Sequence, residues 1–364
     1  MSSRTPPVLS GGGRRRGRGR SRRRARARRT GRARLVTIAV AAAFLVVAVS
    51  ALLEPLTKND SDSPSASHDA GPRLSAPDAH ALGGAPEPSL GSTGSVQAES
   101  RRYALDLSAP PLVALRFKHS PRAGLLFDIR SGRVLWQLRP HRRLPIASLT
   151  KMMTSLLIVE RDDPHDRVLI TRRAVHTGGS GVGVLPKGKR VQLEALLNGL
   201  LLVSGNDAAV ALAQHTAGSV GRFVQMMNVR AHELALTCTH FTSPHGLQDR
   251  GNHSCAADLA AVARADLAQR RIRRITGRDR AIVRFPIKGG KLFLYNNNPL
   301  MRAHYPGLTG LKTGYTDRAG RSIVATARRG RTALGVVLLQ SVDPPTQARK
   351  LLDRGFRAMR RSRG

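Results

Sequence analysis

The sequence predicts an α+β domain, because strand-like runs near both ends of the folded part enclose a stretch with helical periodicity. Residues 124–130 and 133–137 are rich in aliphatic and β-branched residues around the tight turn Ser131-Gly132. Residues 322–327 and 332–339 have the same character. The stretch between them repeats its apolar residues at helical spacing. Strands at both ends of a helical middle predict one sheet that joins the two chain ends.

Positive charge dominates the composition. The 364 residues have a formal net charge of +38, and residues 1–34 hold 14 arginines and no acidic residue. From Arg101 onward, 45 Lys and Arg stand against 16 Asp and Glu, so a net charge of +29 remains on the folded part. Such a surface attracts polyanions. A nucleic-acid partner is not expected, since the chain has no zinc-finger or RNP-like pattern and only 4% aromatic residues.

A membrane segment follows the arginine-rich arm. Residues 35–53 form a run of 19 residues without charge, which at ~1.5 Å per residue is long enough to cross a hydrocarbon core. The positive-inside rule places the arm in the cytoplasm and the rest of the chain outside. We expect an uncleaved single-pass anchor in the cell membrane. A cleaved secretory signal is the alternative, because Ala48-Val49-Ser50 offers a small-x-small cleavage site.

Composition divides the chain into four zones. Residues 1–34 are the cytoplasmic arm and residues 35–53 the transmembrane signal-anchor. Residues 54–110 are rich in Ser, Ala, Gly and Pro, which predicts a flexible linker. Residues 111–358 carry the strand and helix patterns, so we expect the folded domain there.

The first candidate motif is Ser148-Leu149-Thr150-Lys151, at the start of a predicted helix. A spacing of three residues places both side chains on one helix face. A lysine there can take the serine proton if burial and nearby positive charge lower its pKa. By itself the motif is weak, because an N-capping serine followed by a surface lysine gives the same pattern.

Two further motifs follow in the chain. Ser204-Gly205-Asn206 places a hydroxyl and an amide on one turn, where they can reach a common cleft. Lys312-Thr313-Gly314 precedes a strand-like run and offers a cation, a hydroxyl and a close backbone approach, which suit the carboxylate end of a substrate. Separately, they are also explained as a helix cap and a solvated basic turn. The ordered set S-x-x-K, S-x-N, K-T-G is far more specific than any of its members.

This set and its surroundings resemble the low-molecular-mass D-Ala-D-Ala carboxypeptidases, peptidase family S11, among the penicillin-recognising serine enzymes. The resemblance covers roughly residues 112–355. The stretches that carry it are residues 145–154, 202–209, 241–247 and 311–316. It implies the β-lactamase/DD-peptidase-like transpeptidase fold, with an antiparallel sheet and a helical subdomain. It also implies removal of the terminal D-alanine of peptidoglycan stem peptides through an acyl-enzyme, and acylation by β-lactam antibiotics.

Carried over residue by residue, the resemblance implies a complete set of roles. Ser148 is the nucleophile, Lys151 its base, and Ser204 the proton relay. The predicted substrate-binding residues are Asn206, Lys312, Thr313, Gly314 and Tyr315, with the backbone N–H groups of Ser148 and Tyr315 as the oxyanion hole. No metal or cofactor is needed for this chemistry.

Two other functions stay open in the sequence. One is a β-lactamase-like serine hydrolase, for which Glu194 imitates a deacylating base but precedes Ser204 instead of following it. The other is a non-catalytic cell-wall-binding protein, which the high charge would suit. His245 either lines the cleft or shapes the turn at Gly246.

Cys238 and Cys255 fall in the exported part of the chain, where disulfides can persist. They are 17 residues apart, and they flank the loop that contains His245. We treat them as a possible disulfide, because sequence spacing does not establish the geometry that a bond requires.

Overall fold

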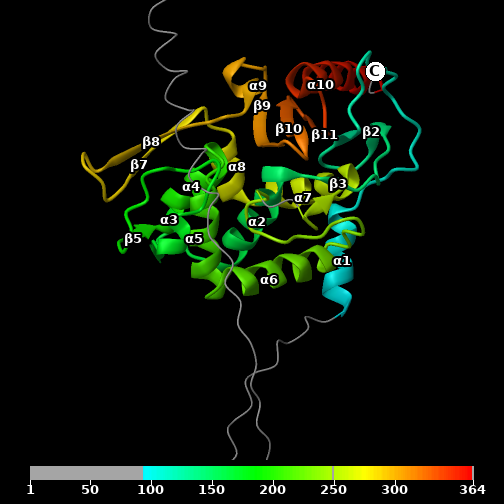
Figure 1. Ribbon diagram of the computed structural model, residues 1–364. Helices are drawn as coiled ribbons and strands as arrows, with labels where there is room; N and C mark the ends of the chain where they lie inside the picture. The colour runs from blue at the N-terminus through cyan, green and yellow to red at the C-terminus, as the bar shows by residue number, and fades with distance from the viewer. Residues whose placement is uncertain (1–92, 248–249, 363–364) are drawn as a thin grey trace, which may run out of the picture. The chain divides into compact units, whose positions relative to one another are not determined.

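Within the part of the chain that the structure describes, a five-stranded antiparallel sheet joins the two ends of the fold (Figure 1). The computed structural model describes residues 93–247 and 250–362. The strand order is β2-β1-β11-β10-β9, and Ala123 of β1 lies opposite Leu339 of β11. This confirms the predicted sheet between the chain ends. The strands are β1 (Ala123–Asp128), β2 (Val134–Leu138), β9 (Leu308–Thr316), β10 (Gly320–Arg329) and β11 (Thr332–Leu339).

Helices cover both faces of this sheet (Figure 1). The C-terminal helix α10 (Pro344–Arg361) packs on one face, and α7 (Ala256–Ala268) packs on the other. Successive strand residues point to opposite faces, so Leu125 belongs to the core on the α7 side and Leu126 to the core under α10. The sheet is buried on both sides, which explains why β1 and β11 contain continuous apolar runs.

A helical subdomain lies on the α7 side of the sheet. Its central helix α2 is buried along most of its length, and α4, α5, α6 and α7 pack against it or its neighbours. The helical periodicity predicted between the strand-like runs is confirmed by these helices. The subdomain helices are α2 (Lys151–Arg161), α3 (Arg172–Val175), α4 (Leu193–Leu202), α5 (Asn206–Ala217), α6 (Val220–Glu233) and α8 (Arg270–Thr276).

Short two-stranded pairs complete the fold. The strand pairs are β3 (Leu144–Pro145) with β6 (His253–Ser254), β4 (Arg167–Leu169) with β5 (Arg190–Gln192), and β7 (Arg280–Arg284) with β8 (Lys291–Tyr295). The short helix α9 (Pro299–Arg302) leads into β9. The β7–β8 hairpin extends beyond the main sheet (Figure 1) and leaves Ile282 and Phe293 exposed on its outer face.

One helix occupies the end of the predicted linker. Helix α1 (Thr93–Tyr103) lies within residues 54–110, where composition predicted only a flexible linker. Its Glu99 binds Arg230 of α6 at 2.6 Å, which lowers the pKa of Glu99, and its Tyr103 is buried. Arg230 also binds Glu160 of α2 at 2.8 Å. These contacts attach α1 to the helical subdomain.

The structure tests the possible disulfide but does not describe the predicted anchor. Cys238 and Cys255 are joined in a disulfide with a Cα–Cα distance of 5.8 Å, a typical separation for a bridge. No helix in residues 93–247 or 250–362 combines the length and apolar character that a membrane span needs. The predicted anchor at residues 35–53 lies outside the described residues.

Candidate active site

Ser148 lies in a short 3-10 turn (η1, Ala147–Thr150) directly before α2. Ala147 has a φ of +47°, in the left-handed region that L-residues seldom adopt. The turn is braced from behind by Gly246, where an added Cβ would lie 1.9 Å from the carbonyl oxygen of Ala147. Only glycine fits this contact. The nucleophile candidate is therefore held by a strained turn with a tightly packed support.

Lys151 is the first residue of α2 and is fully buried. Its Nζ lies 2.8 Å from the Oγ of Ser148, 2.7 Å from the Oδ1 of Asn206 and 2.9 Å from the carbonyl oxygen of His245. Burial lowers the pKa of Lys151 well below its ordinary value, and the positive charge of Lys312 lowers it further, while Asp207 acts in the opposite direction.

Ser204 and Asn206 come from the junction between α4 and α5. Ser204 has a φ of +64°, which turns its side chain toward the cleft end of β9 and costs about 1 kcal/mol for a non-glycine residue. Asn206 begins α5, and its Nδ2 donates to the carbonyl oxygen of Gly178 at 2.8 Å. That bond leaves the Oδ1 to accept from Lys151, so the amide orientation is fixed by its partners.

Lys312 and Thr313 lie on β9, an edge strand of the main sheet. The buried Nζ of Lys312 donates to the Oγ of Ser204 at 2.9 Å, so the second and third motifs are in direct contact. Burial lowers the pKa of Lys312 to about 7. The hydroxyl of Thr313 donates to the Oδ1 of Asn297 at 3.2 Å.

Gly314 and Tyr315 continue β9 past the nucleophile. A Cβ at Gly314 would lie 2.9 Å from the carbonyl oxygen of Ile146, because the strand passes close to the turn that carries Ser148. Tyr315 is 62% exposed at the cleft, and its hydroxyl donates to Asp317. Glycine thus permits the close approach of β9, and tyrosine forms part of the open wall.

A cavity of about 560 Å³ brings these residues together. Lys151 and Asn206 do not line it directly: Lys151 contacts Ser148, and Asn206 contacts Lys151. The predicted site residues that line it directly are Ser148, Ser204, Thr313, Gly314 and Tyr315. The structure thus assembles in one cleft three motifs that are separated by 56 and 108 residues in the chain.

Several cleft residues had no sequence signal. Asn297, in the segment between β8 and α9, lines the cleft, and its Oδ1 accepts from the hydroxyl of Thr313. Arg302, Arg321 and Asp343 also line the cavity. They belong to α9, β10 and the start of α10, and no motif joins them, so only the fold reveals that they meet.

His245 acts chiefly through its loop. Its Nδ1 accepts the backbone N–H of Leu247 at 3.0 Å, and its carbonyl oxygen accepts from Lys151. Burial lowers the pKa of His245 to about 4, and the charges of Lys151 and Arg173 act in the same direction. The neutral ring therefore shapes the turn at Gly246, which was one of the two readings of the sequence.

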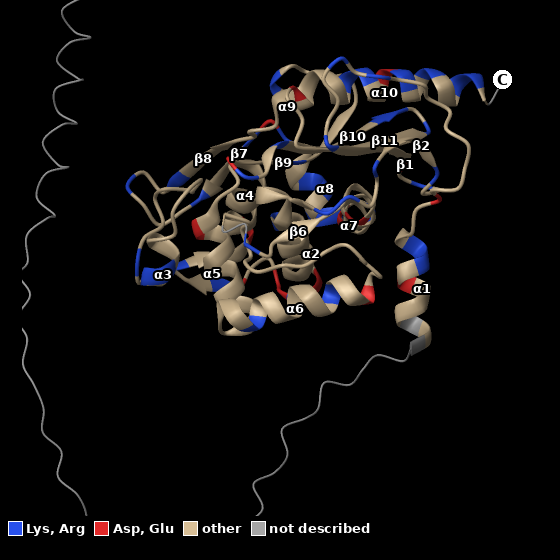
Figure 2. Cartoon of the chain, turned by 45° about the vertical axis from the view of Figure 1, so that its right-hand side comes forward, with Lys and Arg blue, Asp and Glu red and all other residues tan. Residues whose placement is uncertain are grey.

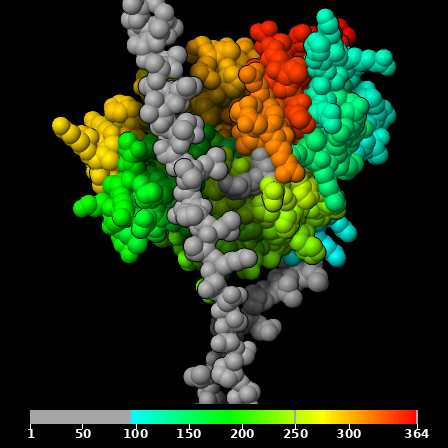
Figure 3. Space-filling model, in the orientation of Figure 1, coloured from blue at the N-terminus to red at the C-terminus, as the bar shows by residue number. Residues whose placement is uncertain are grey.

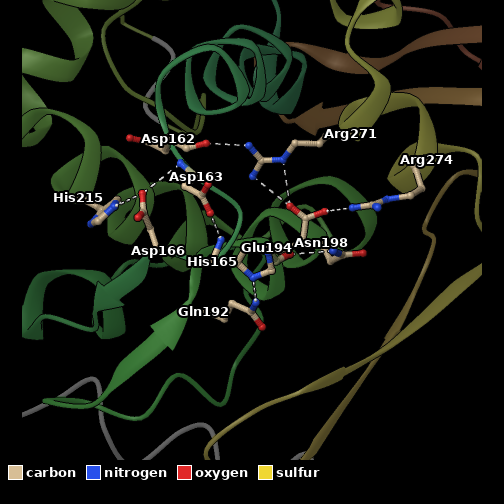
Figure 4. A network of polar contacts seen from close by, with 10 residues as sticks. All are labelled: Asp162, Asp163, His165, Asp166, Gln192, Glu194, Asn198, His215, Arg271 and Arg274. Carbon is tan, nitrogen blue, oxygen red and sulfur yellow. Dashed lines mark hydrogen bonds and ion pairs between the residues drawn. The ribbon is translucent and has the colours of Figure 1, made fainter.

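Glu194 does not belong to the cleft. Its carboxylate binds Arg271 at 3.0 Å and Arg274 at 2.5 Å, on the face of α4 that contacts α8 (Figure 4). It is absent from the residues that line the cavity. Glu194 is thus a polar residue of α4 that is held in two ion pairs.

Two described clusters contain potential metal ligands. Asp162, Asp166 and His215 place their donor atoms within 4.8 Å of one another. These side chains already have partners. His215 binds Asp166 at 3.3 Å (Figure 4), and Asp162 accepts a hydrogen bond from the hydroxyl of Thr216. The other cluster joins His141 to the two cysteines, whose sulfur atoms are bonded to each other. Neither cluster lines the cleft.

Comparison with known proteins gives a consistent result. Residues 110–342 match the family model of the D-alanyl-D-alanine carboxypeptidases, peptidase S11. D-alanyl-D-alanine carboxypeptidase DacF of Bacillus subtilis is 35% identical over 246 residues, which cover 65% of this chain and 62% of the relative. The chain therefore spans about three fifths of that relative's length. DacB2 of Mycobacterium tuberculosis is 35% identical over 64% of this chain and 81% of its own.

Solved structures give the same fold. A D-alanyl-D-alanine carboxypeptidase of Mycobacterium tuberculosis has a TM-score of 0.63 and 32% identity, covering 68% of this chain and 96% of that one. A variant of the Streptomyces K15 DD-transpeptidase has a TM-score of 0.62 and 26% identity, covering 66% and 99%. The chain therefore has the mixed α/β fold of the DD-peptidases.

Proposed function

The chain belongs to the D-alanyl-D-alanine carboxypeptidase family, peptidase family S11, and from this premise we propose that it is a serine-type D-Ala-D-Ala carboxypeptidase. Its substrate is the peptidoglycan stem peptide that ends in D-Ala-D-Ala. It releases the terminal D-alanine through an acyl-enzyme on Ser148. β-Lactam antibiotics acylate the same hydroxyl.

The hydrogen bonds of Lys151 carry this proposal. A neutral amine has two hydrogen atoms and one lone pair. The Oδ1 of Asn206 and the carbonyl oxygen of His245 can only accept, so they take the two hydrogen atoms. The lone pair then points to the hydroxyl of Ser148, 2.8 Å away. Burial and the charge of Lys312 favour this neutral form.

Acylation follows from this arrangement. Lys151 accepts the proton of Ser148 as its Oγ forms a bond to the carbonyl carbon between the two terminal D-alanines. The backbone N–H groups of Ser148 and Tyr315 stabilise the oxyanion. The C–N bond then breaks, and the leaving amine of D-alanine receives a proton by way of Ser204, which Lys312 holds at 2.9 Å. Water hydrolyses the resulting ester and restores Ser148.

Substrate binding uses the other side of the cleft. Lys312 and Thr313 bind the terminal carboxylate, and Asn206 contributes to holding the substrate amide. Gly314 leaves room for the substrate backbone along β9, which as an edge strand has a free side for such pairing. No step of this chemistry uses a metal or cofactor.

A β-lactamase-like function is less well supported. Rapid deacylation would need a base placed to activate water at the ester. Glu194, the residue that imitates such a base in the sequence, is instead bound by Arg271 and Arg274 (Figure 4). The convergence of the three motifs likewise speaks against a non-catalytic wall-binding protein.

We also propose that the enzyme works outside the cell. The uncharged residues 35–53 follow an arginine-rich arm, which supports a single-pass anchor with the catalytic domain on the far side of the membrane. The disulfide between Cys238 and Cys255 agrees with an oxidising compartment. Protease protection of the anchored chain in membrane vesicles tests this orientation.

The direct test of the activity is D-alanine release. The full chain, purified in detergent, is given a peptide ending in Lys-D-Ala-D-Ala, alongside its Ser148→Ala variant and a Ser120→Ala control outside the cleft. We expect release by the wild type and the control, and none by Ser148→Ala. Failure of all three to release D-alanine would exclude the carboxypeptidase. Rapid turnover of penicillin without D-alanine release would favour the β-lactamase instead.

A further inference from the structure

A basic groove runs along the outer side of α10, away from the catalytic motifs. Two adjoining cavities of about 250 and 370 Å³ lie between α10 and residues 112–118. In Figure 3, α10 (red) and this preceding segment (cyan to teal) lie side by side at the surface. We define the basic groove by its six exposed cations: Arg116, Lys118, Lys350, Arg354, Arg357 and Arg361.

Four of these cations form a regular row. Lys350, Arg354, Arg357 and Arg361 follow one another at spacings of four, three and four residues, so they share one face of α10. Figure 2 shows Lys and Arg recurring along this helix to its end. At about 1.5 Å per residue the row is roughly 16 Å long. A row of this length suits a linear ligand with repeated negative charges better than a single small anion.

Four of the six groove cations have no side-chain partner within the described residues, whereas Arg354 donates to the carbonyl oxygen of Ala114 at 2.9 Å. Arg116, Lys350, Arg357 and Arg361 form no ion pair or side-chain hydrogen bond among residues 93–247 and 250–362. The acidic residue beside them, Asp353, is bound by Tyr305 at 2.8 Å and Arg329 at 3.0 Å. Like charges at this density repel one another. A polyanion would relieve that repulsion and gain charge-assisted hydrogen bonds.

The composition of the groove distinguishes among polyanions. Its surroundings contribute none of the large exposed apolar side chains of the described chain, so it lacks the residues that insert into lipid. Its one aromatic residue, Phe117, packs edge-on against Trp136 at 6.1 Å and offers no stacking platform for bases. Instead, the groove presents arginine guanidinium groups, whose N–H donors match the geometry of phosphate oxygens.

We propose that the basic groove binds a linear polymer of phosphate diesters, as a wall polymer of the compartment into which the domain is exported. Asp343 to Pro345, at the start of α10, line the catalytic cavity, whereas the groove begins at Lys350 on the same helix. A polymer bound along α10 therefore holds the enzyme beside its substrate without entering the cleft. This role is independent of the reaction at Ser148.

The test compares two charge-matched variants of the full chain, because the arginine-rich arm contributes equally to both. The groove variant is Arg116→Gln, Lys350→Gln, Arg357→Gln, Arg361→Gln. The control removes four exposed cations that also form no described side-chain bond, from the β7–β8 hairpin: Arg280→Gln, Arg284→Gln, Lys288→Gln, Lys291→Gln. Neither set touches the cleft, so both variants should unfold at the temperature of the wild type.

The probe is a synthetic poly(glycerol phosphate) chain of defined length, and binding is measured by calorimetry over a range of salt concentrations. We expect the groove variant to bind about tenfold more weakly or worse at ~0.1 M salt, with a log–log salt slope shallower by about three. In the hairpin variant, the logarithm of the dissociation constant should change by less than half as much as in the groove variant. Equal losses in both variants, or no loss in either, would overturn the proposal.

Two further probes exclude other sources of phosphate. Vesicles of phosphatidylglycerol and phosphatidylcholine test a lipid surface, and a single-stranded oligo-dT tests nucleic acid. The assignment to a wall polymer would be overturned if the groove variant lost binding only to the vesicles. It would also be overturned if the groove substitutions weakened binding of oligo-dT more than binding of the polymer. A groove-dependent loss that is largest for poly(glycerol phosphate) supports it.

Discussion

Lys151 and Lys312 are both buried at the base of one cleft, and the pKa of Lys151 is held well below its ordinary value first by burial and then by the charge of Lys312. Burial also lowers the pKa of Lys312, to about 7. In the proposed mechanism the two lysines need opposite protonation states. A neutral Lys151 accepts a proton, whereas a charged Lys312 attracts the substrate carboxylate. Activity is therefore expected within a limited pH window.

The first prediction concerns the alkaline side of that window. As the pH rises through about 7, Lys312 loses its proton and with it the attraction for a terminal carboxylate. We expect KM for a peptide ending in a free carboxylate to rise through this range. KM for the same peptide ending in a carboxamide should start higher and change little.

Lys312→Arg is the control for this effect, because arginine stays charged. Its KM for the carboxylate peptide should be independent of pH between 6 and 9, whatever its kcat. A wild-type KM that stays constant over this range would contradict the assignment of Lys312 as the carboxylate partner.

Asn206→Asp tests the neutral state of Lys151. The substitution puts a carboxylate where the Oδ1 now lies, 2.7 Å from the Nζ of Lys151. A negative charge at that distance stabilises the ammonium form and raises the pKa of Lys151. We expect acylation by penicillin at pH 7 to fall about a hundredfold and to recover partly at higher pH. Asn206→Ala lacks the new charge, so a similar recovery there would refute the explanation.

The three motifs could be found from sequence because each is a short run with fixed spacing. The sequence also predicted one sheet that joins the two chain ends, since strand patterns at both ends leave few topologies. It did not predict α7. That helix is rich in alanine and buried on all sides, so it lacks the apolar stripe by which a helix is recognised.

Other parts of the site were beyond sequence reasoning for a different reason. The carbonyl oxygen of His245 binds Lys151, but a backbone oxygen has no residue signature. The left-handed conformation of Ser204 is imposed by the meeting of α4 and α5, since serine itself does not favour it. The contact between Glu99 and Arg230 spans 131 residues within a region that composition describes as a linker. Such features depend on tertiary contacts.

Removing the disulfide should lower both the stability of the fold and the rate of acylation. Cys238 and Cys255 enclose the segment that contains His245 and Gly246, with a sequence separation of 17. Closing a loop of this size stabilises a fold by about 3 kcal/mol. The double variant Cys238→Ala, Cys255→Ala should lose stability of this order in urea unfolding and should also acylate more slowly. Reductant should weaken the wild type similarly and leave the variant unchanged; an effect on both would indicate another cause.

The next prediction is that the stability of the folded chain decreases in acid because of His245. Burial lowers its pKa in the folded chain from 6.5 to about 4. Between these two pH values the unfolded chain binds a proton that the folded chain does not, so stability falls as the pH decreases through the window. The full difference is about 3 kcal/mol. Below about pH 4 this contribution changes no further.

His245→Asn isolates this contribution, because the Oδ1 of asparagine can accept the N–H of Leu247 without titrating. Urea unfolding, followed by the fluorescence of the single tryptophan, Trp136, gives the stability at each pH. The variant should lose up to about 3 kcal/mol less than the wild type between pH 7 and 4. Parallel curves for the two proteins would show that His245 does not titrate as inferred.

Gly246→Ala should slow the acylation of Ser148 by displacing the turn that carries it. Its Cβ would lie 1.9 Å from the carbonyl oxygen of Ala147 and 2.6 Å from the Oγ1 of Thr150, at a φ of +77°. The turn that carries Ser148 must move to admit it, and a displacement of about 1 Å can cost a hundredfold in rate. Gly218→Ala is the matched control, because Gly218 has a φ of +72° but no neighbouring atom within 4 Å of an added Cβ. It should lose only the backbone cost, about 1 kcal/mol, and acylate normally. If both variants acylated at the wild-type rate, the packing of Gly246 would not be what positions Ser148.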